Sequence, residues 1–189
     1  MAPASDRGGS GLDRRGFLAG AATVLLWPRG AVAAEIAEAP PRPAELPPAT
    51  RRLLDESGFV YVSPLLASGA ESACHGEVWF GWLDGTVVIN SRRVTWKVKA
   101  LRTGLDRARI WVGDHGRWKQ GVVGRTRNES FRSAPSFDAR GRFESDRTVL
   151  DRLLALYETK YAAEFARWRE DMRTGFYAGQ RMLIRYEPV

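Results

Sequence analysis

Residues 79–112 read WFGWLDGTVVINSRRVTWKVKALRTGLDRARIWV, and this stretch decides the fold. Runs rich in Trp, Val and Ile alternate in it with short polar breaks, a pattern typical of strands joined by turns. The pair Asp84 and Gly85 separates two such runs, residues 77–83 and 86–89, and an Asp-Gly pair between apolar runs is a strong tight-turn signal. This part of the chain is therefore predicted to form an antiparallel β-hairpin.

Further elements are predicted on both sides of this hairpin. Three more runs have strand character: residues 59–62, 108–112 and 117–127, and a last strand is expected at 181–186. A short helix is predicted over 49–57, and from Asp146 apolar residues recur every three or four positions as far as Trp168, which predicts one long helix. The polar, turn-rich residues 128–145 are predicted to be a loop. This order of elements favours a mainly β fold, a small antiparallel barrel with peripheral helices, and a β-sandwich is the alternative.

Residues 1–34 have the layout of a twin-arginine export signal. Arg14 and Arg15 precede an apolar segment over 18–27, and small residues follow at 31–34. A bilayer core needs about 20 helical residues, so this segment is too short for a stable membrane anchor. The sequence predicts a protein that the twin-arginine export machinery carries in the folded state to the periplasm or beyond. An uncleaved leader or a misannotated start is the alternative.

The rest of the chain is expected to hold one domain. Residues 35–48 are rich in proline and are predicted to be a linker, which leaves 49–189 as a domain of common size. The chain carries 29 Lys and Arg against 22 Asp and Glu, an excess that suits anionic small ligands but is too diffuse to indicate nucleic acid. Cys74 is the only cysteine, so the chain forms no internal disulfide.

A dense cluster of polar and basic residues follows the hairpin. It combines an amide, two hydroxyls and cations within eight positions, and its members are Asn90, Ser91, Arg92, Arg93, Thr95, Trp96 and Lys97. Phosphate groups bind to such mixtures, because cations supply attraction while hydroxyl and backbone donors fix the geometry. The cluster is therefore the candidate ligand-binding site. A solvated basic face at the end of a strand is the alternative.

Aromatic residues are concentrated in the same region, with five tryptophans at 79, 82, 96, 111 and 118. Such side chains can stack on a flat ligand such as an isoalloxazine ring, although in strands they more often belong to the core or to a subunit interface. The neighbours Cys74 and His75 have no partners at metal-ligand spacing, so no metal site is predicted. Neighbours in a strand point to opposite faces, which also argues against a catalytic pair.

The stretch 79–112 resembles the pyridoxamine 5'-phosphate oxidase-like proteins of the FMN-binding split β-barrel superfamily. In that family a hydroxyl residue at the strand end, a second one four positions on and a basic residue two further hold the phosphate of FMN, and Ser91, Thr95 and Lys97 match these places. The family's oxidases also carry an Arg and a Lys that bracket the preceding strand. Here those places are taken by Gly76, Glu77, Gly81 and Trp82.

The resemblance implies a split barrel, a homodimer with the cofactor at the subunit boundary, and an FMN-dependent oxidoreductase that acts on a small redox substrate by hydride transfer. It leaves two alternatives open. One is an enzyme that uses the deazaflavin F420 instead of FMN, and the other is a barrel that binds a flavin, haem or another anionic ligand without turnover or has lost its cofactor altogether. The sequence indicates no acid or base, so no catalytic residue is assigned.

Overall fold

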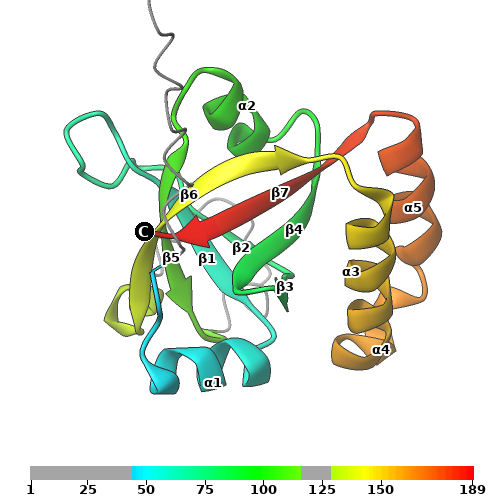
Figure 1. Cartoon of the computed structure of the whole chain (residues 1–189), viewed down its shortest axis with the longest axis horizontal. Coiled ribbons are helices and arrows are strands. Elements are labelled where there is room, and N and C mark those ends of the chain that lie inside the picture. The colour runs from blue at the N-terminus through cyan, green and yellow to red at the C-terminus, as the bar shows by residue number, and fades with distance from the viewer. Residues whose placement is uncertain (1–43, 116–128) are drawn as a thin grey trace, which may run out of the picture. The chain divides into compact units, whose positions relative to one another are not determined.

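The computed structural model describes residues 44–115 and 129–189, and these form one seven-stranded antiparallel sheet that curls into a split barrel with helices outside it (Figure 1). The spatial order of the strands is β2-β1-β5-β6-β7-β4-β3. The strands are β1 (Val60–Pro64), β2 (Gly76–Val78), β3 (Gly81–Leu83), β4 (Thr86–Arg92), β5 (Arg107–Val112), β6 (Ser136–Glu144) and β7 (Arg181–Pro188). The predicted fold class is thereby confirmed.

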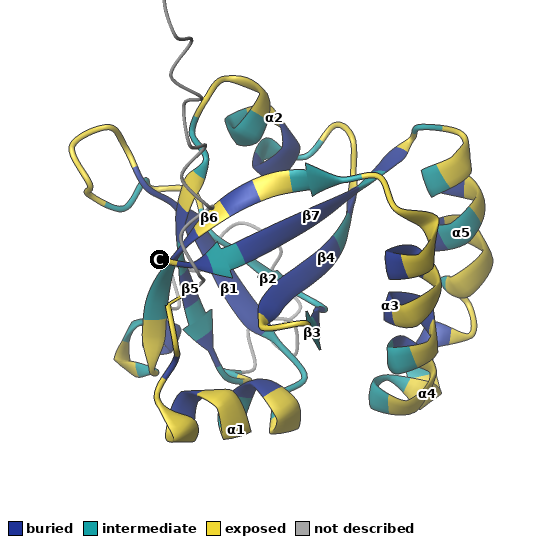
Figure 2. Ribbon diagram, viewed as in Figure 1, coloured by how far each residue is buried: buried dark blue, intermediate teal, exposed yellow. Residues whose placement is uncertain are grey.

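Helices flank the sheet and divide the apolar residues into two cores. The helices are α1 (Pro48–Glu56), α2 (Trp96–Arg102), a 3₁₀ turn (Ser130–Ser133), α3 (Arg147–Lys160), α4 (Ala162–Phe165) and α5 (Arg169–Tyr177). Strand β4 serves both cores, because successive strand residues point to opposite faces. Val87 and Ile89 pack inside the barrel, whereas Val88 packs with α3 and α5. Figure 2 shows the resulting buried strands and the exposed outer surfaces of the helices.

The predicted hairpin is confirmed, but its first strand is divided. Leu83 pairs with Thr86 across the Asp84-Gly85 turn, whereas β2 pairs with β1 at the opposite edge of the sheet. Trp79 and Phe80 carry the chain from one edge to the other. The pairing of β3 with β4 stops at Val88, so residues 89–92 of β4 pair with β7 on one side only. This opening in the barrel is where the candidate site lies.

The predicted loop over 128–145 is wrong, because β6 occupies Ser136–Glu144 and pairs with both β5 and β7. Its sequence has no β-branched residue, and Ala139 and Gly141 are the residues that it buries. A Cβ atom at Gly141 would lie 2.8 Å from the Tyr186 ring, so a small residue is needed there. Packing against its neighbours therefore made a strand from residues whose local preference is for turns.

The single helix predicted from Asp146 to Trp168 is also wrong. The chain leaves the helix at Tyr161, where φ is −127° and ψ is 34°, and continues as α4 and α5. The Tyr161 hydroxyl donates to the Gly58 carbonyl at 2.8 Å and accepts from the Phe80 backbone N–H at 3.0 Å. The break thus places the Tyr161 hydroxyl where it can form hydrogen bonds with backbone groups of the segment that crosses from one sheet edge to the other.

The remaining predicted elements fall in two groups. The first helix and the strands at 59–62, 108–112 and 181–186 are confirmed within a few residues. The strand predicted over 117–127 and the export signal lie outside the described residues. At the start of the described part, the Ala44 N–H donates to the Pro188 carbonyl at 3.1 Å and Leu46 is buried in the barrel core. In the described ranges, no helix is both long and apolar enough to cross a membrane.

Candidate cofactor-binding pocket

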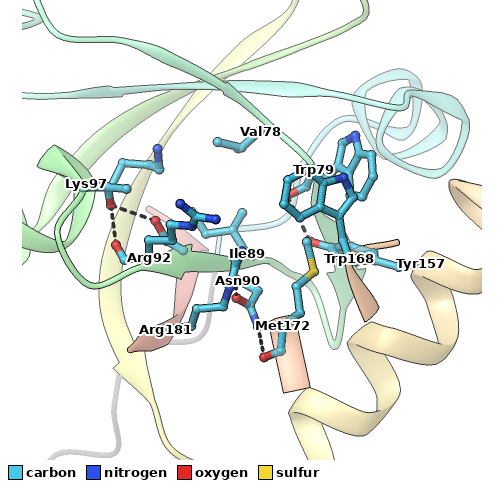
Figure 3. A pocket seen from close by; sticks show the side chains of 12 residues that line it. Val78, Trp79, Ile89, Asn90, Arg92, Lys97, Tyr157, Trp168, Met172 and Arg181 are labelled. Carbon is cyan, nitrogen blue, oxygen red and sulfur yellow. Dashed lines mark hydrogen bonds between the residues drawn. The ribbon is translucent and has the colours of Figure 1, made fainter. Parts of the chain in front are cut away.

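A pocket of about 750 Å³ lies in the opening beside the unpaired edge of β4 (Figure 3). One side, here called the basic end, contains Asn90, Ser91, Arg92, Thr95, Lys97 and Arg181. The other side, here called the aromatic end, contains Trp79, Tyr157, Trp168 and Met172. Val78 and Ile89 complete the lining. The volume is in the range of pockets that hold cofactors and other small molecules.

The structure brings five of the seven predicted site residues together in this lining and leaves two outside it. Arg93 is exposed, and its backbone N–H donates to the Gln180 carbonyl at 2.8 Å. Trp96 packs against the barrel core, and its ring lies 4.7 Å from the Lys97 ammonium. Trp96 therefore supports Lys97 from behind rather than lining the pocket.

Lys97 is the cation that best fits a bound anion. It is the second residue of α2, its exposed fraction is 9%, and no carboxylate of the described residues pairs with it. Loss of hydration lowers the pKa of its ammonium to about 8. A buried charge is unfavourable unless an opposite charge or hydrogen bonds compensate it. An anionic ligand group in the pocket would supply that compensation.

Two hydroxyls stand beside Lys97. The oxygens of Ser91 and Thr95 are 2.8 Å apart, and Thr95 donates its proton to the Arg92 carbonyl at 2.9 Å. Ser91 is therefore the donor of the pair, because a hydroxyl carries a single proton. Both groups are rotors at the pocket surface, and a small rotation turns either proton towards a ligand oxygen. The pair can supply hydrogen-bond donors to an anionic group in the pocket.

The basic end also contains Arg181, which the sequence analysis did not identify. Arg181 lies opposite Arg92 in the pairing of β7 with β4. Its Nη1 donates to the Asn90 Oδ1 at 3.2 Å, and its Nε donates to the Asp171 Oδ2 at 3.1 Å. The Asn90 amide in turn donates to the Met172 carbonyl at 3.4 Å. Only the register of β7 reveals this position, so no sequence motif could have indicated it.

The aromatic end is built around Trp79, which lies in the crossing segment. Its ring stacks on the Tyr161 ring with centroids 4.5 Å apart and an angle of 9° between the planes. The Tyr157 hydroxyl donates to the Trp79 carbonyl at 3.0 Å, and burial raises the pKa of that phenol well above its ordinary value. Of the other tryptophans singled out in the sequence, those at 82, 96 and 111 do not line the pocket, and Trp118 lies outside the described residues.

The lining offers groups suited to binding an anion and to stacking on a ring. The residues that line the pocket include three cations and no Asp, Glu, His or Cys. In the described part of the chain, no group of three such side chains could hold a metal ion. The arrangement can bind an anionic group at one end and a flat ring at the other, and it supplies no carboxylate or imidazole for proton transfer.

Comparisons with known proteins show a similarity of fold and nothing further. No protein-family model and no curated protein matches the chain. Among solved structures, the chain is similar to Rv2991 from Mycobacterium tuberculosis, with 14% identity and a TM-score of 0.50 over 77% of this chain and 82% of that one. It is also similar to HutZ, the haem storage protein from Vibrio cholerae, with 14% identity, a TM-score of 0.48, and 77% and 92% coverage. At such identities the similarity describes the split-barrel fold alone.

Proposed function

We propose that this protein binds FMN by its phosphate and uses it to oxidise or reduce a small molecule. The observation that carries the proposal is the environment of Lys97, a buried ammonium with no described acidic partner, next to the hydroxyls of Ser91 and Thr95. These are the positions at which the sequence resembles the FMN phosphate site of pyridoxamine 5'-phosphate oxidase-like proteins. Charge, donors and resemblance therefore point to the same ligand group.

The chain's own residues would bind, orient and shield the cofactor. Lys97 and Arg92 attract the phosphate, while the hydroxyls of Ser91 and Thr95 orient it. Trp79 and Trp168 offer apolar surface to a flat ring and keep water from it. The flavin, when bound, supplies the hydride or electron transfer. Because the lining contains no carboxylate or imidazole, we expect protons to be exchanged with solvent or with the substrate itself.

Binding without turnover is the second candidate, and Gly76 favours it. The family's oxidases carry a cation at this end of the strand, but a Cβ atom at Gly76 would lie 3.1 Å from the Trp96 ring and 3.5 Å from the Lys97 Nζ. Any side chain at this position would require the Trp96 ring to shift. The pocket therefore lacks one of the family's cations, and a protein that only holds a flavin, F420 or haem would tolerate that loss better than an oxidase.

Export and assembly belong to the same proposal. The twin-arginine signal at residues 1–34 would place the folded, loaded protein in the periplasm or outside the cell. Replacement of both Arg14 and Arg15 by Lys should retain the protein inside the cell, and fractionation of cells measures this. The resemblance also implies a homodimer, which light scattering on the purified protein tests.

The cofactor is tested by spectroscopy on the purified full chain. We expect flavin absorption bands, and release of a compound with the mass of FMN on heating. Lys97→Met should lose the bound FMN, because the phosphate loses its buried cation. Lys99→Met is the matched control, since Lys99 lies on the same helix but is exposed and outside the lining. A colourless wild-type protein that takes up no added FMN would contradict the proposal.

Catalysis is tested by reduction of the bound flavin. A nicotinamide or quinol donor should bleach the flavin bands, and a small-molecule acceptor should restore them. If every donor leaves the bands unchanged while FMN stays bound, the second candidate, binding without turnover, is the correct one.

A further inference from the structure

We propose that Arg181 is the third cation of the phosphate site, and that with it the site selects a terminal phosphate monoester over a phosphodiester or an uncharged ligand. This inference rests on the proposed function and deepens it. It concerns a residue 84 positions beyond Lys97 in the sequence, on a strand that contributes nothing else to the pocket lining.

The first observation is the position of Arg181. The residue directly opposite it on β4 is Arg92, and both line the basic end of the pocket. Residues directly opposite on neighbouring antiparallel strands point to the same face of the sheet, with their Cβ atoms about 5 Å apart. Both side chains therefore leave the sheet on the same face at the basic end, the Arg92 side chain exposed and the Arg181 side chain buried. Two cations on one face of the sheet make this end attractive to an anion.

The second observation is the number of donors that remain on Arg181. A guanidinium has five N–H groups, and the structure gives one bond from Nε to Asp171, one from Nη2 to Asp171 and one from Nη1 to Asn90. Two N–H groups thus have no partner among the described residues. The side chain is only 8% exposed. Because Arg181 lines the pocket, acceptor oxygens of a ligand can meet these two groups there.

The third observation is that the side chain is held in place. A Cβ atom at Gly175 would lie 3.1 Å from both Cγ and Cδ of Arg181, so α5 passes close to the aliphatic part of the arginine. Asn90 fixes the guanidinium from the sheet side, and the Asn90 amide is itself held by the Met172 carbonyl. A donor that is already oriented loses little freedom when a ligand binds.

Asp171 acts against ligand binding in this arrangement. Its side chain is 48% exposed and pairs with Arg181 from outside the pocket lining. The ion pair reduces the positive charge that Arg181 presents to a ligand. Since the carboxylate is half in water, we expect its removal to be tolerated by the fold and to strengthen the attraction between Arg181 and an anion.

Charge and donor number define the class of ligand. Lys97, Arg92 and Arg181 bring three positive charges to the pocket lining, one of them partly offset by Asp171, and the hydroxyls of Ser91 and Thr95 belong to the same lining. A phosphate monoester carries close to two negative charges at neutral pH and has three terminal oxygens that accept strong hydrogen bonds. The phosphodiester of F420 and each of the two linked phosphates of FAD carry one charge and two such oxygens, and riboflavin has no phosphate. The basic end therefore fits FMN better than FAD, F420 or riboflavin.

The test compares FMN, FAD and riboflavin by fluorescence titration of the full chain. Wild-type protein should bind FMN most tightly. Arg181→Met should weaken FMN binding by roughly 10- to 100-fold, in line with hydrogen bonds to charged groups, and change riboflavin binding by less than about threefold. Equal losses for FMN and riboflavin would overturn the assignment, because Arg181 would then act on the ring or on the fold. Arg181→Lys, which keeps the charge, should recover part of the FMN affinity.

Asp171→Asn should change the affinity for FMN in the opposite direction to Arg181→Met, and it leaves Arg181 itself in place. We expect FMN binding to tighten by roughly three- to tenfold, since a partner of Arg181 is removed. Asp151→Asn is the matched control, because Asp151 is an exposed carboxylate that pairs with Arg173 outside the pocket lining. Weaker FMN binding by Asp171→Asn, or an equal gain in both variants, would overturn the proposal.

Inorganic phosphate separates this inference from the proposed function. If the wild-type protein binds neither FMN nor riboflavin, the flavin proposal fails. The phosphate site would still be supported if phosphate raised the Tm of the wild-type protein, raised it further for Asp171→Asn and raised it less for Arg181→Met. An identical response of all three proteins to phosphate would overturn the role of Arg181.

Discussion

The two ends of the pocket are built in different ways. At the basic end, every polar residue except Arg181 comes from residues 90–97, where β4 ends and α2 begins. The aromatic end combines Trp79 from the crossing segment with Tyr157 from α3 and Trp168 and Met172 from the α5 region. The difference shows that one short segment can bring together side chains suited to a phosphate. The surface for a ring, by contrast, requires elements that are far apart in the sequence.

The two ends also differ in what they do to stability. Lys97 is a cation buried at 9% exposure with no acidic partner among the described residues, and such burial of charge opposes folding. Trp79, Tyr157 and Tyr161 pack ring against ring, which favours folding. Apolar substitution of Lys97 and truncation of an aromatic ring should therefore shift stability in opposite directions, and should affect different parts of a bound flavin.

The largest effect is expected at Trp79. Trp79→Ala should weaken the binding of FMN and riboflavin alike by roughly 10- to 100-fold, because stacking of a flat ring on an aromatic side chain contributes about 1–3 kcal/mol. Titration with both flavins measures this. Trp82→Ala is the control, since Trp82 is also partly buried but lies outside the pocket lining. If Trp79→Ala weakened the binding of FMN but not of riboflavin, the flavin ring would not lie at the aromatic end.

Tyr161→Phe should lower the free energy of unfolding by about 2 kcal/mol, because the Gly58 carbonyl and the Phe80 N–H would lose their partner in a buried place. Urea denaturation measures the change. Tyr177→Phe is the control and should alter stability little, since Tyr177 is 48% exposed. An unchanged midpoint for Tyr161→Phe would mean that water replaces the phenol, and that the crossing segment does not depend on it.

The affinity for FMN should fall as the pH rises above 8. The anion binds the protonated form of Lys97, and burial lowers the pKa of that ammonium to about 8 in the ligand-free protein. Each pH unit above this value should therefore weaken binding up to about tenfold, while binding stays constant from there down to about pH 6, where the phosphate gains a proton. Titrations from pH 6.5 to 9.5 test this, and Lys97→Met should show no such slope.

The smallest effect expected is a gain in stability. Lys97→Met should raise the free energy of unfolding of the ligand-free protein by about 1 kcal/mol, because a buried charge is replaced by an apolar group of similar length. The lowered pKa of Lys97 gives the sign: below about pH 8 the ammonium stays charged in the folded state, so its cost is fully present at pH 7. Between pH 8 and 10.5 the free energy of unfolding of the wild-type protein should rise towards that of Lys97→Met. A loss of stability at pH 7 would show that the contact with the Trp96 ring outweighs desolvation.

The sequence predicted one end of the site much better than the other. Five of its seven candidate residues lie in the lining, because their positions follow from the end of a strand and the start of a helix. Arg93 and Trp96 lie outside the lining, since local geometry turns one to solvent and the other to the core. Arg181, Tyr157 and Met172 were not identified, because only strand register and helix packing bring them to the pocket.

The fold shows the same division. Alternating apolar runs and the Asp-Gly turn were enough to predict the hairpin, most of the strands and the barrel, since side-chain periodicity is a local property. The strand β6 was missed, because its small residues are selected by close contact with neighbours such as Tyr186. The predicted strand 77–83 was not continuous, because the two halves of the segment pair at opposite edges of the sheet.

By itself, the sequence predicted an antiparallel barrel domain and a candidate phosphate-binding cluster beside a strand end. Tertiary structure alone decided where the barrel opens, which aromatic rings face the opening, and that a cation from β7 joins the cluster. The physical reason is the range of the interactions. Periodicity, turns and capping act between neighbours in the chain, whereas sheet register and the packing of α3 and α5 join residues up to 103 positions apart.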